Sequence, residues 1–188
     1  MRPIDVCRAQ LLRWTQPRAG RSAYQLWVGP QGPERAERPV RAEATGTERV
    51  AILRWQRGAQ AVAEAAPGRW TFRRAGFWHP RVIVSLAGSD RAVAVFTARW
   101  TGTGTLELSA GRQVHWSAAH AWQADDGTPL VAFTSRQGLI TLEGTVALTP
   151  FAVGAPDLAL LVLLGWYLVV LQVRDTHTMT AALVAATT

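Results

Sequence analysis

The side chains in this chain that could bind a metal ion are mainly its histidines. His79, His115 and His120 fall within one stretch of the 188-residue sequence. A zinc site needs three or four ligands that converge on one point, and only histidines are available here. The residues around them alternate between apolar and polar, so we interpret the histidines as part of the polar face of a sheet. We expect no bound metal.

Two further motifs that resemble reactive sites are better explained by turns. The Gly-Thr repeat at residues 101–105 lacks the lysine and the following helix that a phosphate-binding loop requires. Asp125 and Asp126 are adjacent, so on a strand their carboxylates point to opposite faces, and Gly127 after them favours a hairpin turn. Because no motif pairs a nucleophile with a base, we expect no catalytic residue, no cofactor and a non-enzymatic protein.

The strongest candidate site is a group of arginines interleaved with aromatic residues. A guanidinium group binds phosphate through two parallel hydrogen bonds, and an aromatic side chain exposed in a turn can insert among lipid headgroups or stack on a base. The candidate ligand-binding residues are Arg69, Arg73, Arg74, Arg81, Arg99 and Trp78. Alternatively, the aromatic residues form the core of the fold and the arginines are an ordinary solvated surface.

These residues lie on a chain that reads as many short strands. Apolar and polar residues alternate from about residue 24 to residue 148, which indicates an antiparallel sheet with one buried face. The expected strands cover residues 22–28, 39–44, 48–55, 60–65, 69–74, 81–87, 91–98, 104–109, 112–117, 119–124, 130–135 and 139–148. The stretch 59–66 fits a helical turn equally well. About twelve strands at this spacing predict a sandwich or a closed barrel.

The pattern changes after Pro156, where residues 158–173 are apolar on every side. Such a helix has no solvent face, so it either spans a bilayer or is enclosed by protein. Sixteen residues rise about 24 Å, against roughly 30 Å of bilayer hydrocarbon. A barrel of eleven or twelve strands leaves a lumen that a helix can fill. We therefore expect this helix inside the barrel, with Gly165 allowing a bulky barrel residue to approach closely.

The fold class that we predict is mainly β, a closed antiparallel barrel of about twelve strands around one central C-terminal hydrophobic helix. The barrel domain is expected over residues 21–174 with the helix at 157–174, an N-terminal extension at 1–20 and a C-terminal tail at 175–188. The chain has 20 arginines, no lysine and a net charge of +7. One cysteine excludes an intrachain disulfide framework, and the N-terminal residues lack the apolar segment of a secretion signal. Both features indicate a cytoplasmic protein.

The combination of a tryptophan-rich barrel and a final hydrophobic helix resembles the tubby C-terminal-like superfamily, which includes tubby domains, phospholipid scramblases and LURP-one-related proteins. The stretches that carry the resemblance to its bacterial members are Trp70-Thr-Phe-Arg-Arg-Ala-Gly-Phe-Trp-His-Pro-Arg81, Trp100-Thr-Gly-Thr-Gly-Thr105 and Leu163-Leu-Gly-Trp-Tyr-Leu168. The resemblance implies a twelve-stranded barrel threaded by its terminal helix. Tubby domains bind phosphoinositides through lysine and arginine, but this chain has no lysine, so no site residue is transferred.

These observations lead to two functional hypotheses. The first is a non-enzymatic tubby-like barrel, peripheral at the membrane, that binds an anionic phospholipid or a protein partner through its arginine and aromatic face. Nucleic acid is the less favoured partner. The alternative is a single-pass, tail-anchored membrane protein in which the helix at 157–174 is the anchor.

Overall fold

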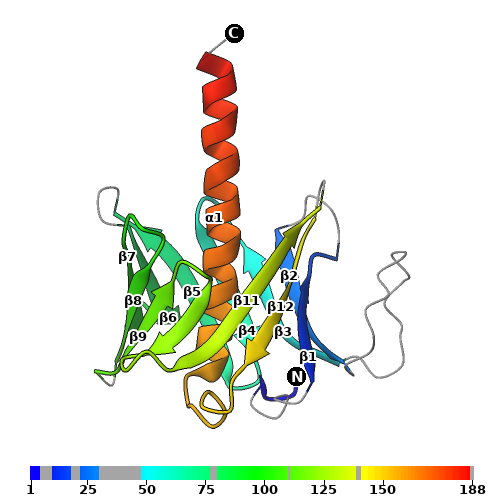
Figure 1. Ribbon diagram of the computed structural model, residues 1–188, viewed down its shortest axis with the longest axis vertical. Coiled ribbons are helices and arrows are strands. Elements are labelled where there is room, and N and C mark those ends of the chain that lie inside the picture. The colour runs from blue at the N-terminus through cyan, green and yellow to red at the C-terminus, as the bar shows by residue number, and fades with distance from the viewer. Residues whose placement is uncertain are drawn as a thin grey trace.

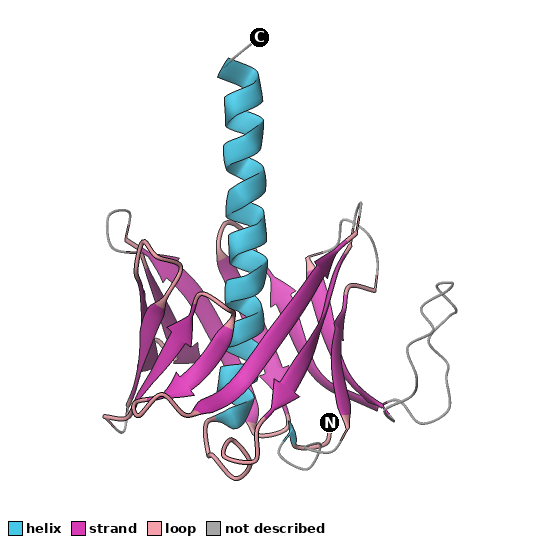
Figure 2. Ribbon diagram, in the orientation of Figure 1, coloured by secondary structure: helices cyan, strands magenta, loops and turns pink. Residues whose placement is uncertain are grey.

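The computed structural model describes residues 1–4, 10–17, 22–29, 48–76, 80–109, 111–138 and 141–186, with side chains as far as residue 176. It shows a closed antiparallel barrel of twelve strands around one C-terminal helix (Figures 1 and 2). The predicted fold class is confirmed.

Each strand pairs with its neighbours in the sequence, and β1 pairs with β12 to close the barrel. The strands are β1 (Leu11–Thr15), β2 (Ala23–Gly29), β3 (Glu48–Trp55), β4 (Gln60–Ala65), β5 (Gly68–Ala75), β6 (Arg81–Leu86), β7 (Ala92–Ala98), β8 (Gly104–Leu108), β9 (Gln113–Ser117), β10 (Ala121–Ala124), β11 (Pro129–Gln137) and β12 (Leu142–Leu148). Closure leaves no free sheet edge between these strands, which removes a site for unwanted strand pairing.

The alternation of side chains agrees with the expected inner and outer faces. On β5, Trp70 and Phe72 are buried inside the barrel, whereas Arg69 and Arg73 are exposed outside. The stretch that also fitted a helical turn is the strand β4, where Ala61, Ala63 and Ala65 are buried and face inward. Small residues on β4 therefore lie beside large residues on the neighbouring strands, as the lumen of a barrel requires.

Two boundaries of the expected domain organisation are wrong. The extension at 1–20 contains β1, which is part of the barrel wall, with Leu12 and Trp14 buried. This strand is short, and only two inward apolar positions mark it in the sequence. The other error concerns the tail at 175–188, because the helix continues far past residue 174. The expected strand at 39–44 and Ile140 lie outside the described residues.

The helix α1 (Leu158–Ala186) enters at one end of the barrel and projects from the other (Figure 1). Residues 158–170 are all buried. These thirteen residues rise about 20 Å, which is the depth over which the barrel surrounds the helix. The apolar character of the helix on every side is therefore explained by a wall that contacts it on every side.

Gly165 has the role that was expected of it. A Cβ atom at this position would overlap the ring of Phe133 and lie 2.9 Å from Nε1 of Trp122. The missing side chain lets Trp122 approach the helix and donate a hydrogen bond of 2.8 Å to the carbonyl oxygen of Leu161. A single glycine thus allows two large aromatic residues of the wall to contact the helix backbone.

Candidate functional site

The two ends of the barrel differ, and we name them by the path of the helix. The exit rim surrounds the helix where it leaves the barrel, and it consists of the β1–β2, β3–β4, β5–β6, β7–β8, β9–β10 and β11–β12 connections, the two adjacent residues of each strand, and helix residues 171–176 (Figure 1). The opposite rim consists of the remaining connections and adjacent strand residues, together with residues 1–4 and 149–157.

An aromatic stack holds the helix at the exit rim. The ring of Tyr167 stacks on Trp55 with 4.8 Å between centroids, and the guanidinium of Arg174 lies 4.8 Å from the centroid of Trp55 on the same rim. The hydroxyl of Tyr167 donates a hydrogen bond to the carbonyl oxygen of Ala59 in the β3–β4 turn. Burial raises the pKa of Tyr167 well above its ordinary value. These contacts fix the rotation of the helix within the barrel.

Polar contacts hold the same segment of the helix from two other sides. Nη1 of Arg74, at the end of β5, lies 2.7 Å from Oδ2 of Asp175. Across the rim, Nε2 of His120 lies 2.9 Å from Oε1 of Gln172. The helix is therefore attached to the wall by side chains from β3, β5 and the β9–β10 turn.

The charges of the described residues are divided unequally between the rims. The exit rim has seven arginines and two acids, a formal charge of +5, whereas the opposite rim has five arginines and seven acids, a formal charge of −2. The exit-rim arginines are Arg54, Arg57, Arg74, Arg81, Arg99, Arg136 and Arg174. Among the described residues no ion pair is found for Arg57, Arg81, Arg99 or Arg136. The exit rim is therefore the end of the barrel that attracts anions.

One of these arginines directly precedes an exposed tryptophan in the sequence, and a second lies on the neighbouring strand. Arg81 begins β6 and Arg99 follows β7, and a hydrogen bond of 3.0 Å from the amide of Ala98 to the carbonyl of Pro80 brings their strands together. Trp100 is 85% exposed, the highest value among the large hydrophobic residues that the structure describes as exposed. A large exposed apolar side chain on the same rim as arginines without an ion pair is suited to contact with a surface that is both anionic and apolar.

A tight turn holds Trp100 in this position. The amide of Arg99 donates to the carbonyl of Thr103 at 2.8 Å, and the amide of Gly102 donates back to the carbonyl of Arg99 at 3.2 Å. Gly102 has a φ of 76°, a left-handed conformation that glycine adopts without strain. The turn therefore fixes the backbone and leaves the indole outside.

The fold brings together only part of the predicted site. Arg74, Arg81 and Arg99 all lie on the exit rim, although Arg74 is occupied by Asp175. Arg69 lies on the opposite rim, where it faces Glu64 across the β4–β5 pair. Arg73 is on the outer face of the sheet between Gln60 and Ile83.

Trp78, the one aromatic residue of the predicted site, lies outside the described residues. The predicted binding residues did not include Arg57, Arg136 or Arg174, and Trp100 was expected only as one of the aromatic residues among the arginines. For Trp100 a signal was present, because the Gly-Thr repeat directly after it marks a turn that exposes its neighbour. The sequence around Arg136 and Arg174 does not show that they lie at the same end of the barrel as Arg81, because this depends on strand pairing and helix direction.

The fold also creates a hydrogen-bonded series that the sequence did not predict. Oγ1 of Thr105 lies 3.4 Å from Nδ1 of His115, and Nε2 of His115 lies 2.9 Å from Oδ1 of Asp125. The order of groups is that of a nucleophile, base and orienting acid. However, Asp125 is largely exposed, and no convergent hydrogen-bond donors for an oxyanion are found around Thr105 among the described residues. The series links β8, β9 and the β10–β11 turn.

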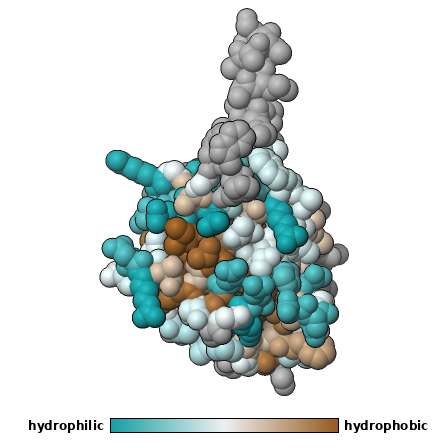
Figure 3. Space-filling model, turned by 90° about the vertical axis from the view of Figure 1, so that its left-hand side faces the viewer, coloured by the Kyte–Doolittle hydropathy of each residue, from teal (hydrophilic) through white to brown (hydrophobic). Residues whose placement is uncertain are grey.

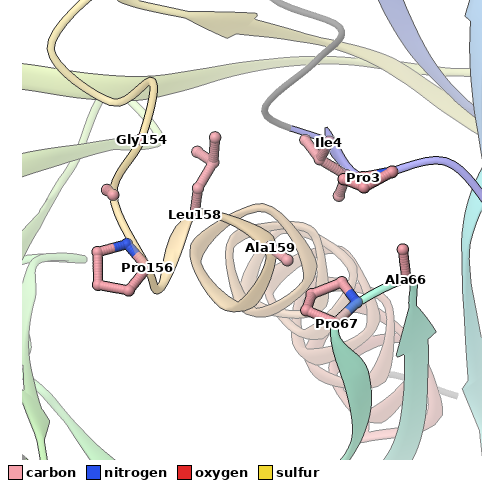
Figure 4. A pocket seen from close by; sticks show the side chains of 9 residues that line it. Pro3, Ile4, Ala66, Pro67, Gly154, Pro156, Leu158 and Ala159 are labelled. Carbon is pink, nitrogen blue, oxygen red and sulfur yellow. The ribbon is translucent and has the colours of Figure 1, made fainter.

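An apolar hollow of about 300 Å³ lies at the opposite rim, where the helix begins (Figure 4). Its lining residues are Pro3, Ile4, Ala66, Pro67, Gly154, Ala155, Pro156, Leu158 and Ala159. None of these side chains carries a charge or a hydrogen-bonding group, so the hollow can bury a small apolar group, and any polar contact with a ligand would come from the backbone.

Further findings concern metals, membrane spans and known proteins. No group of three or more metal-binding side chains is found among the residues that the structure describes. One helix there, Leu158–Thr176, is long and apolar enough to cross a membrane, and 72% of its apolar 18-residue window is buried inside the barrel. No family model, curated protein or solved structure matches this chain. The resemblance to the tubby-like superfamily stays a prediction.

Proposed function

We propose that this protein is a non-enzymatic barrel that attaches to an anionic phospholipid surface through its exit rim. The observation that carries the proposal is the exposed Trp100 next to Arg99 in the sequence, with Arg81 on the neighbouring strand, on the rim whose described residues have a formal charge of +5. The tubby-like resemblance points in the same direction, since tubby domains bind phosphoinositides through basic residues.

Electrostatic attraction and insertion of an aromatic ring both contribute to this attachment. Each arginine near an anionic leaflet contributes about 1 kcal/mol, and this attraction decreases beyond a Debye length of about 8 Å at physiological salt. Tryptophan prefers the boundary between headgroups and acyl chains, because its ring is apolar and its N–H is polar. Arg57, Arg81 and Arg99 supply the attraction at the rim, and Trp100 supplies the insertion.

The projecting helix adds a third term. From residue 176 onward the sequence has no Asp, Glu, Lys or Arg, and α1 continues to Ala186. Residues 177–186 rise about 15 Å along the helix, which is about half of the 30 Å hydrocarbon core of a bilayer. With the exit rim on the headgroups, this part of the helix reaches into one leaflet without crossing the membrane.

The alternative function, a single-pass anchor formed by residues 157–174, is supported by the composition of Leu158–Thr176. In the barrel, however, residues 158–170 contact the wall on every side. A bilayer span by this segment would require the barrel to release its own core, at a large cost in buried apolar area.

The test is co-sedimentation of the purified protein with vesicles of phosphatidylcholine alone and with vesicles that also contain phosphatidylserine. We expect binding to the anionic vesicles only, and a decrease as salt is raised. Replacing both Arg81 and Arg99 with glutamine removes about 2 kcal/mol of attraction, which is roughly a 30-fold loss of affinity. The matched control replaces Arg69 and Arg91 of the opposite rim with glutamine and leaves the affinity unchanged.

Trp100→Ala separates insertion from attraction, because it weakens binding while the net charge stays the same. Equal binding to neutral and anionic vesicles, or an equal loss in the two pairs of arginine variants, would contradict the proposal. If the protein is found only in the membrane fraction and needs detergent to be extracted from it, the hypothesis of a single-pass anchor is correct instead.

A further inference from the structure

The outer face of the barrel carries a row of side chains that crosses six strands from β4 to β9. Residues that pair with each other across neighbouring strands form the row, which reads Gln60, Arg73, Ile83, Val95, Glu107 and Gln113. Two apolar residues stand at its centre, a positive and a negative charge flank them, and a glutamine stands at each end. No ion pair is found for Arg73 or Glu107 within the described part of the chain.

When two copies of the row face each other in opposite directions, apolar residues meet apolar residues and Arg73 meets Glu107. We propose that the face of β5–β8 is the interface of a homodimer, in which Arg73 of one copy pairs with Glu107 of the other. Figure 3 views the side of the molecule on which β7 and β8 lie, and it shows hydrophobic residues grouped there among hydrophilic ones. A two-fold interface uses the same patch on both copies, so that patch must complement itself.

A two-fold axis that brings each residue of the row against its complement in the second copy is parallel to the strands and lies between β6 and β7. Rotation about this axis places Ile83 against Val95 of the second copy, and Arg73 against Glu107, so each pairing occurs twice. Neighbouring strands are about 4.8 Å apart, so the two charges stand about 7 Å on either side of the axis. Because the barrel surface curves away from the axis, the long side chains of Arg73 and Glu107 are suited to bridge the widening gap.

The rows above and below agree with the same axis. Toward the exit rim, Arg81 on β6 pairs with Thr97 on β7, so in the dimer Arg81 meets a threonine and not another arginine. Toward the opposite rim, Ser85 pairs with Ala92, which places two small side chains together. No charged residue of these rows is therefore brought against a like charge.

The dimer has a consequence for the orientation of the two barrels. Because the axis is parallel to the strands, the strand ends at the exit rim stay on the same side in both copies. Because barrel strands are tilted relative to the barrel axis, by about 35–45°, the two barrels diverge from the symmetry axis and their exit rims do not lie in one plane. The dimer itself does not depend on the proposed lipid attachment, since its central residues Arg73, Ile83, Val95 and Glu107 are outside the exit rim.

The test is sedimentation velocity of the full chain over a wide range of protein concentration, without lipid. We expect a concentration-dependent dimer for the wild type. Arg73→Glu alone and Glu107→Arg alone each place like charges together twice, and each raises the dissociation constant at least about tenfold. The double variant R73E/E107R exchanges the charges and restores the dimer. Arg136→Glu, which reverses the same charge on β11, away from the face of β5–β8, leaves the dimer intact.

Circular dichroism of each variant confirms that the barrel is folded, because all the substituted side chains point outward. A wild type that is monomeric at every concentration overturns the proposal. A dimer that survives both single charge reversals, or one that the double variant fails to restore, shows that another surface forms the interface and also overturns it.

Discussion

The indole Nε1 of Trp122 on β10 donates a hydrogen bond of 2.8 Å to the backbone carbonyl oxygen of Leu161 in the central helix. A buried indole N–H is more stable with an acceptor, and the carbonyls along a helix are normally covered by side chains and already accept the amide four residues on. Here Gly165 follows Leu161 by one helical turn and exposes this carbonyl. The contact ties the helix to the wall at one height and in one rotation.

Gly165→Ala is expected to destabilise the protein, although alanine favours a helix more than glycine by about 1 kcal/mol. The new Cβ overlaps the ring of Phe133, and overpacking costs about 1–3 kcal/mol. Gly165→Leu costs more and prevents folding at ordinary temperature. Urea denaturation followed by circular dichroism measures the free energy of unfolding. Combining Gly165→Ala with Phe133→Leu should recover part of the loss, and an unchanged or higher stability of Gly165→Ala alone would refute the packing described here.

Leu164→Asp is expected to unfold the barrel as a whole. Leu164 is fully buried between the helix and the wall, and an unpaired buried charge costs about 3–5 kcal/mol, which is a large part of the stability of a small domain. Thermal unfolding compares this variant with Thr176→Asp, which places the same charge on the exposed part of the helix. A cooperatively folded, soluble Leu164→Asp protein would mean that the helix is not enclosed.

Two C-terminal deletions should have different effects. Removal of residues 177–188 leaves every described contact of the helix with the wall in place, so the free energy of unfolding changes by less than about 0.5 kcal/mol. Removal of residues 171–188 also deletes Gln172, Arg174 and Asp175, and we expect a loss of about 1–3 kcal/mol. The shorter deletion should weaken attachment to anionic vesicles while leaving the fold unchanged. Equal stability of the two proteins would show that the exit-rim contacts contribute nothing.

Alkaline solution is expected to destabilise the protein through its only two tyrosines. Burial raises the pKa of Tyr24 and Tyr167 above the ordinary value of about 10, and the positive charge of Arg174 opposes part of the shift at Tyr24. The unfolded chain therefore loses these protons first. The stability from the neutral hydroxyls is complete below about pH 10 and is lost as the pH rises toward the folded values.

Tyrosinate absorbance reports only these two residues, and it should rise together with the loss of the circular dichroism signal. Tyr167→Phe should reduce the steepness of alkaline unfolding, and it also removes the hydrogen bond to Ala59. If the absorbance rises at the ordinary tyrosine pKa in a protein that is still folded, the hydroxyls are not buried as described.

Much of the barrel wall and the enclosed helix can be predicted from the sequence, because the alternation of a strand and the apolar run of a buried helix are both local patterns. On β5 the alternation of Trp70 and Phe72 with arginines identifies the inner face without knowledge of any partner strand. Residues 158–170 are apolar on every side, which already requires an environment without water. β1 was missed because five residues with only two inward apolar positions, Leu12 and Trp14, give too short a pattern.

The site could not be predicted in the same way. It depends on the end of the barrel at which each residue lies, and not only on whether its side chain faces outward. Arg69 and Arg74 are close in the sequence, but a strand rises about 3.3 Å per residue, so five residues separate them by about 17 Å and place them at opposite rims. Arg81 and Arg99 are eighteen residues apart, yet an antiparallel turn brings the start of β6 beside the end of β7. The sequence alone determined which side chains face outward, since that follows from the period of a strand. Only the closed barrel decided which of them share a rim, because strand pairing and helix direction are long-range properties that no local pattern contains.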